Sequence, residues 1–320
     1  MIRIVRRPDP SRRRDIVTRL AAVFAALVCA SLIMAALGYN PVAVFSNIIV
    51  GSTGTAHRIR QTIVKAIPLT TLSLGVAVCF KMKFWNIGAE GQFYLGALFA
   101  TWTAYHFKTL PAGALLPLMF AASLIGGGLW ALMPAVLKSK FRTSEILVTL
   151  MLNYVATKFI TYLQYGPWKD PSAGGFAKMP KFVDAAVLPK LFGVHIGWII
   201  VLVLALAVHI LLAKTKLGYE ISVIGESETT ARYAGISVAG VTAAAVMIGG
   251  GLCGAAGFMQ ASAIEKSLTD QLSAGLGFTA VITAWLARLS APAVVVVSLL
   301  FAALLQGSAY IQTALQVPSA

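Results

Sequence analysis

A succession of long apolar runs is the feature that most constrains how this chain folds. The runs lie near residues 17–38, 59–80, 91–108, 112–137, 144–165, 196–213, 239–260, 275–288 and 292–314. A helix of about 20 apolar residues crosses the roughly 30 Å hydrocarbon core of a bilayer. Of the 320 residues, 58% are hydrophobic and only 12% charged, and that charged share is about half of what a soluble domain needs. The sequence therefore predicts an all-α, polytopic integral membrane bundle of about nine spans, with the short run at 275–288 as a broken or re-entrant element.

The cations indicate the orientation of these spans. One group precedes the first run or stands at every second junction between runs, and it consists of Arg3, Arg6, Arg7, Arg12, Arg13, Arg14, Arg19, Lys81, Lys83, Lys138, Lys140, Arg142, Lys214, Lys216, Arg232 and Arg288. The smaller group on the other side is Arg58, Arg60, Lys108, Lys169, Lys178, Lys181, Lys190 and Lys266. Because cytoplasmic loops carry the excess of Lys and Arg, residues 1–16 are expected to be a basic cytoplasmic N-terminus and residues 17–320 one transmembrane domain. The formal net charge of +15 is then a topology signal, which argues against nucleic-acid binding.

Residues 166–195 form the longest segment expected on the exterior. It contains Pro167, Pro171, Pro180 and Pro189 and a Gly174-Gly175 pair, which break regular structure. Two interpretations stay open: a compact lid or docking rim, and a simple linker loop.

The segment 83–92, KFWNIGAEGQ, places polar residues and glycines between two apolar runs. An acid near the centre of a spanning helix costs about 2.5–3.5 kcal/mol, so Glu90 is not expected to face lipid. Glycines allow a broken backbone there, provided that its amides and carbonyls face protein or water. The residues of this candidate translocation path or hinge are Asn86, Gly88, Glu90, Gly91 and Gln92. The alternative is a helix start, in which Asn86 is the cap and Glu90 complements the helix dipole.

Two further features lie inside expected spans. Asn153 is either a contact for a translocated solute or a hydrogen-bonding bridge between helices. The glycines of the segment 249–257 stand three and four residues apart, which predicts close helix packing more readily than a pore lining. Glu145, after Thr143 and Ser144, is expected to cap the first turn of its helix.

Residues 214–238 form a polar cytoplasmic loop between two apolar runs. Ser227, Thr229 and Thr230 are candidate caps for a short helix over residues 231–234. Such a helix along the membrane face fits a groove in a partner and transmits rigid-body motion, although an ordinary loop is the alternative. The candidate contact residues are Gly218, Gly225, Glu226, Ser227, Arg232 and Tyr233.

Motifs of catalysis and of nucleotide or metal binding are missing from the sequence. There is no G-x-x-x-x-G-K-[ST] phosphate loop and no Gly-x-Ser-x-Gly nucleophile elbow. The four histidines are scattered, and the three cysteines lack metal-ligand spacing. We therefore expect a chain that is not an enzyme, with no catalytic residues, no metal and no cofactor of its own.

Five blocks of the sequence, in order, resemble one family. They are FWNIGAEGQFYLGA from residue 84, SEILVTLMLNYVA at 144–156, GYEISVIGESETTARYAGI at 218–236, GGGLCGAAGF at 249–258 and GLGFTAVITAWLARLSAP at 275–292. Together they are similar to the permeases of ABC importers for nucleosides and simple sugars, within the branched-chain amino acid permease group.

This resemblance implies a permease domain in a bacterial plasma (inner) membrane and a set of partners. They are a cytoplasmic ABC ATPase that uses ATP and Mg, a second similar permease in a heterodimer, and an exterior solute-binding lipoprotein, with membrane lipid around the bundle. It also implies that residues 214–238 couple to the ATPase. Family members commonly have Asn where Glu226 stands, and they continue with one more helix beyond the end of this chain, which we therefore expect to lack its last helix.

The alternative function is a secondary transporter of a small polar solute, driven by an ion gradient. Such a carrier needs intramembrane acids, and only Glu90 qualifies. A membrane scaffold without transport activity is disfavoured by the interrupted segment at 85–92.

Overall fold

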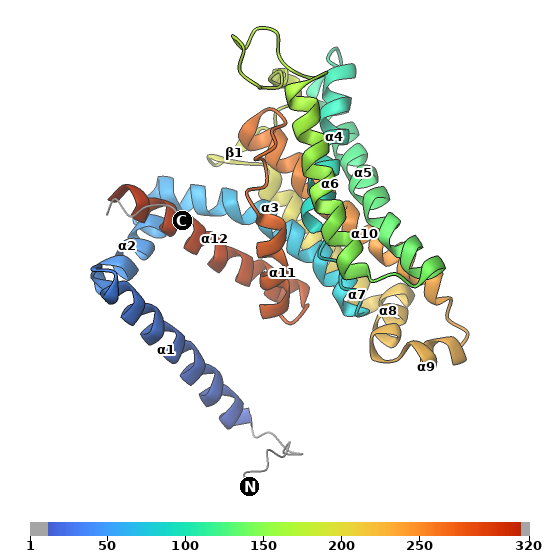
Figure 1. Cartoon of the computed structure of the whole chain (residues 1–320), viewed down its shortest axis with the longest axis horizontal. Helices are drawn as coiled ribbons and strands as arrows, with labels where there is room; N and C mark the ends of the chain where they lie inside the picture. Colours follow the sequence, from blue (N-terminus) through green and yellow to red (C-terminus); the bar gives the residue numbers. More distant parts are fainter. Residues whose placement is uncertain (1–11, 315–320) are drawn as a thin grey trace.

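The computed structural model of the chain describes residues 12–314. Its helices are α1 (Arg12–Ala36), α2 (Pro41–Thr53), α3 (Ala56–Lys81), α4 (Ala89–His106), α5 (Ala112–Phe141), α6 (Glu145–Tyr165), α7 (Gly197–Lys214), α8 (Lys216–Glu226), α9 (Glu228–Tyr233), α10 (Val238–Gln260), α11 (Leu276–Leu286) and α12 (Ala291–Ala314). Shorter elements are a 3-10 turn η1 (Asp184–Ala186), a π-helical turn η2 (Ala261–Glu265) and the strands β1 (Lys190–Leu191) and β2 (Val194–His195). The predicted all-α membrane bundle is confirmed (Figure 1).

Within residues 12–314, six helices are long and apolar enough to cross a membrane: α3, α5, α6, α7, α10 with η2, and α12. The other three runs predicted as spans behave differently. The first becomes part of a pair, α1 and α2, bent by 113°, which makes a seventh span if the pair is counted as one. The run at 91–108 becomes α4, which has 18 residues but includes polar Glu90 and Gln92. The run at 275–288 becomes α11, which has only 11 residues.

The N-terminal helix stands apart from the rest of the bundle. Figure 1 shows α1 as a separate arm that joins the bundle through α2, and α2 packs on α12 and α3. Helix α1 begins at Arg12, within the segment expected to be the basic N-terminus. Residues 1–11 of that segment, and the chain end beyond which the last family helix is expected to be missing, lie outside the described residues.

Helix α10 lies at the centre of the bundle and packs on α3, α4 and α5. Glycines make this possible because they let backbones touch. A Cβ atom on Gly249 would lie 2.6 Å from both Cys79 Sγ and Gly75 O, and one on Gly127 would lie 2.8 Å from Gly254 Cα. No real Cβ atom tolerates such contacts, so the predicted packing role of the glycine segment 249–257 is confirmed.

The segment 166–195 is folded rather than open. It contains η1 and a hairpin in which Lys190 pairs with His195 and Leu191 with Val194. The His195 side chain is buried, and neither of its ring nitrogens has a hydrogen-bond partner among the described residues. The hairpin therefore holds a neutral imidazole in an apolar setting.

Adding one methyl group at the centre of the bundle should destabilise it. In Gly254→Ala the new Cβ would lie 3.0 Å from Gly127 Cα and would overlap the carbonyl oxygen of Ser123. We expect the free energy of unfolding to fall by roughly 1–3 kcal/mol, measured as the midpoint of thermal unfolding in detergent. The matched control is Gly113→Ala in the first turn of α5, where nothing lies within 4 Å of an added Cβ. Equal midpoints for both variants would refute the packing role.

The hairpin should lose stability in acid. Burial and, to a smaller extent, the charge of Lys190 lower the pKa of His195 from 6.5 to about 4. An unfolded hairpin therefore takes up the proton below about pH 6.5, while the folded hairpin takes it up only near pH 4. Stability is complete above pH 6.5 and falls by roughly 3 kcal/mol as the pH drops towards 4. Amide hydrogen exchange of residues 190–197, corrected for intrinsic rates, measures this loss at pH 7.5 and pH 5. His195→Leu should flatten the dependence; an unaltered pH profile in that variant contradicts the assignment.

Candidate functional site

The junction between α3 and α4 is the first candidate site. Helix α3 ends at Lys81, Lys83 adopts a left-handed φ of 57°, and α4 begins only at Ala89. Asn86 holds the intervening turn, because its Oδ1 accepts a hydrogen bond of 3.0 Å from the amide of Gly88. The polar segment 83–92 thus folds as a helix break followed by a new helix start.

A pair of buried amides closes this turn. Asn86 Nδ2 donates to Gln92 Oε1 at 3.1 Å, and Gln92 Nε2 donates to Asn86 Oδ1 at 2.8 Å. The exposed fractions of the two side chains are 0% and 1%. Each amide therefore satisfies the other inside the bundle, where a polar group without a partner would cost several kcal/mol.

Asn153 of α6 joins the same junction from a neighbouring helix. Its Oδ1 accepts from the amide of Gly91 at 2.8 Å, and its Nδ2 donates to the carbonyl of Ile87 at 2.9 Å. One side chain thus provides a hydrogen-bond partner for an amide in the first turn of α4 and for the carbonyl that precedes this helix. A Cβ on Gly91 would lie 3.0 Å from both Asn153 Oδ1 and Trp130 Nε1, so the glycine gives Asn153 room to approach.

Glu90 connects the start of α4 to the start of α11. Its Oε2 accepts a hydrogen bond of 2.8 Å from the amide of Gly277, and only 7% of its surface is exposed. Helix α11 begins after Gly275, which has a left-handed φ of 83° and makes no side-chain cap. The carboxylate therefore satisfies one of the free amides at the α11 N-terminus and complements its dipole. Glu90 acts on the dipole of a second helix as well as standing in the first turn of its own.

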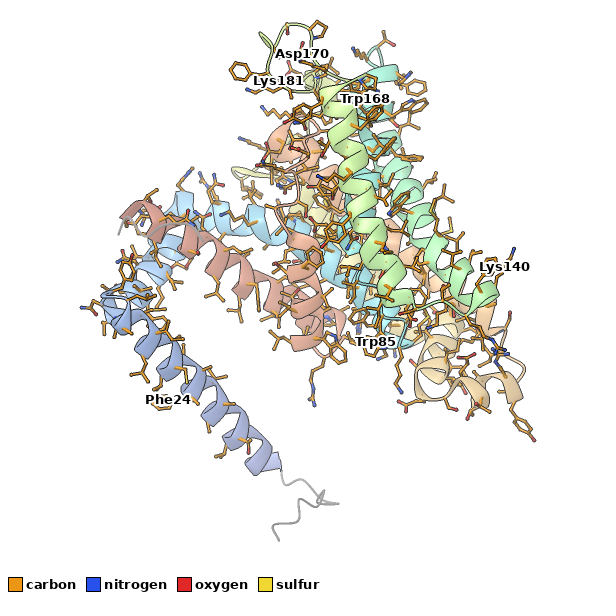
Figure 2. The ribbon with its side chains drawn as sticks, viewed as in Figure 1. Phe24, Trp85, Lys140, Trp168, Asp170 and Lys181 are labelled. Carbon is orange, nitrogen blue, oxygen red and sulfur yellow. The ribbon has the colours of Figure 1, made fainter. Side chains whose placement is uncertain are left out.

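Helix α11 is held against the same junction along its length. Trp285 near its C-terminal end stacks on Trp85, with ring centroids 5.5 Å apart and planes 17° apart. Between these ends, the hydroxyl groups of Thr283 and Ser73 of α3 are in hydrogen-bond contact. The segment 83–92 and α11 therefore form one unit, which we call the α4–α11 junction, and Trp85 marks its lower end in Figure 2.

The polar side chains of the α4–α11 junction form hydrogen bonds with one another or with backbone groups of the chain. The hydrogen bonds of Asn86, Gln92, Asn153 and Glu90 all go to other groups of the chain. Within residues 12–314, no group of three or more His, Cys, Asp and Glu side chains is placed to hold a metal ion. The arrangement supports positioning of helices rather than chemistry on a bound group.

The second candidate site is the polar segment between α7 and α10, which folds as two short helices. Helix α9 begins after Ser227, whose Oγ accepts a hydrogen bond of 3.2 Å from the amide of Thr230. The predicted short helix and its cap at Ser227 are confirmed, whereas the other candidate caps, Thr229 and Thr230, lie inside the helix. Tyr233 is 95% exposed, and Arg232 pairs with Glu228 at 2.7 Å rather than with Glu226. Glu226 ends α8 and is also exposed. This end of the segment offers its side chains to solvent.

The two glycines of the segment are placed differently. A Cβ on Gly218 would lie 2.7 Å from Leu212 Cα of α7, and one on Gly225 would lie 3.3 Å from Met82 Cα and overlap the carbonyl of Lys81. Both glycines are buried. They seat α8 on the end of α7 and on the end of α3, and they are not available to touch another protein.

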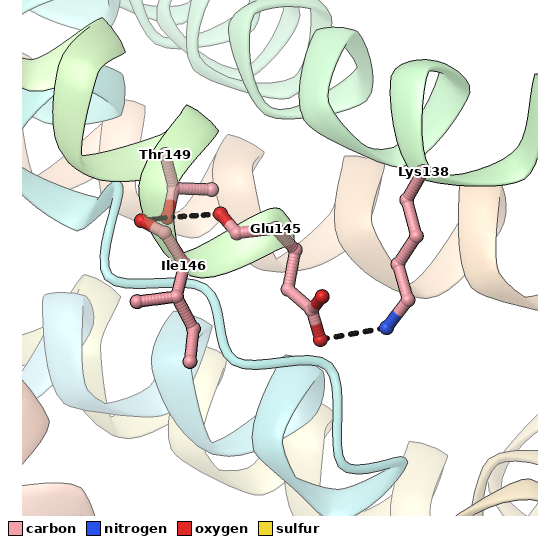
Figure 3. Close-up of polar contacts among 4 residues, drawn as sticks. All are labelled: Lys138, Glu145, Ile146 and Thr149. Carbon is pink, nitrogen blue, oxygen red and sulfur yellow. Dashed lines mark hydrogen bonds and ion pairs between the residues drawn. The ribbon is translucent and has the colours of Figure 1, made fainter. Parts of the chain in front are cut away.

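A cavity of about 1200 Å³ opens beside α8 and α9. Its charged lining residues are Lys83, Lys138, Lys140, Arg142, Glu145, Glu226, Glu228 and Arg232. Lys138 of α5 crosses it to Glu145 of α6 at 2.6 Å, and Thr149 Oγ1 donates to the Glu145 carbonyl at 2.7 Å (Figure 3). The expected cap at this helix start is wrong, since Ser144 makes no side-chain cap bond and the Glu145 carboxylate pairs with a lysine instead.

Sequence reasoning missed two parts of these sites. Helix α8 was expected to be loop, although Leu217, Ile221 and Ile224 stand at helical spacing and two of them are buried. Gly277, the partner of Glu90, lies far from it in sequence, and no local signal joins Glu90 to α11. Lys138, the partner of Glu145, lies near it in sequence, and this pair was not predicted either. A long-range pair such as Glu90 with Gly277 follows only from the packing of the helices.

Comparison with known proteins identifies relatives along nearly the whole chain. The profile of the family described as branched-chain amino acid transport system / permease component matches residues 58–319. A glucose ABC transporter permease of Haloferax volcanii is 34% identical over 95% of this chain and 83% of its own length. A guanosine ABC transporter permease of Bacillus subtilis is 29% identical over 96% of this chain and 90% of its own length.

A nucleoside ABC transporter permease of Lactococcus lactis is 26% identical over 93% of this chain and 85% of its own length. No protein of solved structure matches the chain. The ion-gradient alternative has no support among these relatives. Coverage of this extent, together with a helical membrane bundle, shows that the chain belongs to the permease family of branched-chain amino acid transport systems and is a permease subunit of an ABC transporter, which leaves ATP hydrolysis to a partner subunit.

Proposed function

We propose that this permease imports nucleosides or simple sugars, and that motion of α9 drives it through the α4–α11 junction. The observation that carries the coupling is the seat of α8, where Gly225 packs against the Lys81 carbonyl. Lys81 is the last residue of α3, and the broken segment with Asn86 follows at once. A displacement of α8 and α9 therefore acts directly on the turn that ends in Glu90.

The partners follow from the family and from the two faces of the bundle. ABC permeases of this family work with an ATPase and a substrate-binding component. We assign ATP and Mg to the ATPase, which docks on α9 and the cavity beside it. We assign the second permease to a heterodimer, and the binding component to a lipid-anchored protein on the exterior. The chain is then a multi-pass inner-membrane protein with a cytoplasmic N-terminus.

The junction residues act as a hinge in this proposal, rather than as the lining of the translocation path. Asn86, Gln92 and Asn153 are almost fully buried and bond to one another or to backbone, so little of their polarity faces an open pathway. Gly88 and Gly91 keep the turn tight: a Cβ on Gly88 would lie 2.9 Å from Asn86 Oδ1. A hinge of a few residues that absorbs the change at a helix terminus is the usual element of such rigid-body switches.

Nucleosides are the first choice of solute and simple sugars the second. Relatives named for guanosine, nucleosides and glucose all cover most of this chain. Uptake of radiolabelled guanosine and glucose into proteoliposomes tests the proposal, with the chain, its partner permease, the ATPase and the binding protein present. ATP-dependent accumulation of one of them supports it; accumulation that needs an ion gradient and no ATP overturns it.

Removing the exposed side chains of α9 should uncouple the transporter. Tyr233 is 95% exposed, so Tyr233→Ala combined with Arg232→Ala loses almost no packing within the chain. We expect uptake and solute-stimulated ATP hydrolysis to fall by about tenfold or more, the loss typical of a docking hot spot, with the midpoint of thermal unfolding retained. Tyr165→Ala, an equally aromatic exposed residue at the opposite end of the bundle, is the control. Normal coupling in the double variant refutes the role of α9.

A hinge and a path predict different kinetics for variants of the α4–α11 junction. In Gly277→Ala the added Cβ would lie 2.5 Å from the backbone nitrogen of Glu90 and 2.6 Å from its Oε2, and should push the α11 N-terminus away from the start of α4 and from the carboxylate. Loss of such a cap costs roughly 1 kcal/mol, and we expect a several-fold lower maximal uptake rate with an unchanged KM for solute. Glu90→Gln, which keeps the shape, should lie between this variant and the wild type. A raised KM with an unchanged maximal rate assigns Glu90 to the path instead.

A further inference from the structure

One side of helix α6 carries polar and aromatic side chains that face away from the bundle. Tyr154, Lys158 and Tyr162 follow one another at intervals of four residues, so they lie along the same side of the helix. Lys158 is exposed, and 64% of each tyrosine is exposed. We call these three residues the α6 face. By contrast, the large hydrophobic side chains exposed on α7, the next span in the chain, are all aliphatic: Leu202, Val203, Leu206 and Ile210.

The chain itself offers no partner for the α6 face. Helix α6 packs on α4 and α5. Apart from the ion pair of Glu145, the hydrogen bonds of its side chains come from other positions: Thr149, Asn153, Thr157, Thr161 and Gln164. Within residues 12–314, the Lys158 amine forms no ion pair, and neither it nor the two tyrosine hydroxyls donate a hydrogen bond. The partners of these groups are therefore water or another molecule.

The position of Lys158 disfavours lipid as its surroundings. Helix α6 has 21 residues and is therefore about 30 Å long, the thickness of the hydrocarbon core. Lys158 precedes the last residue of α6, Tyr165, by seven positions, which places it about 10 Å from the nearer end of the helix. Helical side chains lean towards the N-terminus of their helix, away from that end, so the amine is poorly placed to reach the interface. An ammonium group at such depth faces water or a polar ligand.

The tyrosines extend this polar surface along the helix. Tyr165 itself needs no ligand, because tyrosines are enriched where spanning helices meet the interface with water. Tyr162 lies about one turn inside that end, and Tyr154 stands near the middle of the span. Successive members of the α6 face lie about 6 Å apart along the axis. The face therefore runs from near one end of α6 to its middle, as the wall of a solute path does.

A permanent contact with another protein explains the α6 face less well than a solute does. Such a contact at Lys158 needs a carboxylate buried in the membrane on the other protein, and the attraction within a buried pair often does not repay the cost of desolvation. A few convergent polar groups on an otherwise apolar wall are instead typical of small-molecule sites.

We propose that Tyr154, Lys158 and Tyr162 line the solute path and bind nucleosides on their way through it. The inference rests on the proposed import function and names the part of the chain that contacts the solute. The base stacks on the tyrosine rings, which accept any base because every base has a π-face. The Lys158 amine has three donors and no acceptor, which suits the carbonyl and ring-nitrogen acceptors of a purine.

The α6 face is also connected to the proposed hinge. Asn153, the residue before Tyr154, bonds to the amide of Gly91 and to the carbonyl of Ile87. A movement of the α4–α11 junction therefore acts on α6 at the level of Tyr154. The wall of the path and the hinge are separate groups of residues that move together.

Accessibility of introduced cysteines tests whether the α6 face lines a path. The background is Cys29→Ser, since Cys29 is the exposed native cysteine and Cys79 and Cys253 are buried. Cysteine is then placed singly at each position of the α6 face, in the complete complex in proteoliposomes. The probe is a charged methanethiosulfonate reagent, which attacks the thiolate and so reacts in water but not in lipid. We expect modification at all three positions, slowed about fivefold or more by guanosine, as stacking of a base implies.

The matched control is Leu206→Cys on the aliphatic face of α7, which should not react with the charged reagent. If the α6 positions behave like this control and react only with a membrane-soluble maleimide, lipid covers them and the proposal is wrong. If they react with neither reagent, another protein covers them, and the proposal is again wrong. Modification that guanosine does not slow shows a water-filled cavity without a solute site, which also overturns it.

Uptake measurements separate a path residue from a coupling residue. In Tyr154→Leu the ring is lost, and guanosine uptake should fall about fivefold or more, with ATP hydrolysis and the midpoint of thermal unfolding retained. Tyr154→Phe keeps the ring and should retain most of the uptake. Phe159→Leu, which removes a ring 44% exposed on a neighbouring side of α6, is the control and should stay within about twofold of the wild type. A parallel loss of uptake and ATP hydrolysis in Tyr154→Leu contradicts a path role.

The charge of Lys158 gives a second variant. Lys158→Met keeps the length of the side chain and removes its donors, so uptake per ATP hydrolysed should fall while the protein stays folded. A wild-type complex that accumulates neither guanosine nor glucose overturns the import function itself. A wild type that accumulates glucose alone overturns the nucleoside assignment, and normal uptake of guanosine by the wild type and by all variants of the α6 face overturns only this inference.

Discussion

Helix ends that lie inside the bundle are the constraint on which the rest of the structure depends. A helix that starts within a membrane protein leaves amides with no water to bond, so side chains or backbone must satisfy them. In this chain, Asn153 accepts a hydrogen bond from the amide of Gly91 at the start of α4. Glu90 accepts one from the amide of Gly277 at the start of α11. These bonds join helices that are distant in sequence, and they fix where both broken helices begin.

The same constraint supports the proposed hinge at the junction. A broken helix has fewer backbone hydrogen bonds to lose than a continuous one, so the turn at residues 83–88 is the place where α3 and α4 can change their relative angle at least cost. The glycine seat of α8 on Lys81 brings α8 and α9 to the edge of this turn. The stacked pair Trp85–Trp285 then carries any movement of the turn to α11 as well.

The sequence predicted the helices of this structure better than it predicted the contacts between them. Apolar runs identified most of the spans, and Ser227 was among the predicted caps of the short helix α9, because both signals are local in the chain. The count of spans differed where a run was too polar or too short, as in α4 and α11. Glycine spacing predicted tight packing around Gly254, but which helix it touches depends on the complete bundle. The contact of Glu90 with α11 could not be predicted, because it joins positions 187 residues apart and no periodicity relates them.

Helix α11 is connected by contacts to both ends of the bundle. On one side, Gln164 bonds to both Ala177 and Asp270, and so joins the segment 166–195 to the segment that precedes α11. On the other side, α8 contacts the end of α3, and the following turn and Glu90 hold α11 through Trp85 and the Glu90 carboxylate. Neither face needs a long-range force to affect the other, since every step is a contact between packed or hydrogen-bonded groups. In the proposed mechanism, an element of 11 residues with attachments at both ends moves as a rigid piece, so a shift imposed at one end reaches the other.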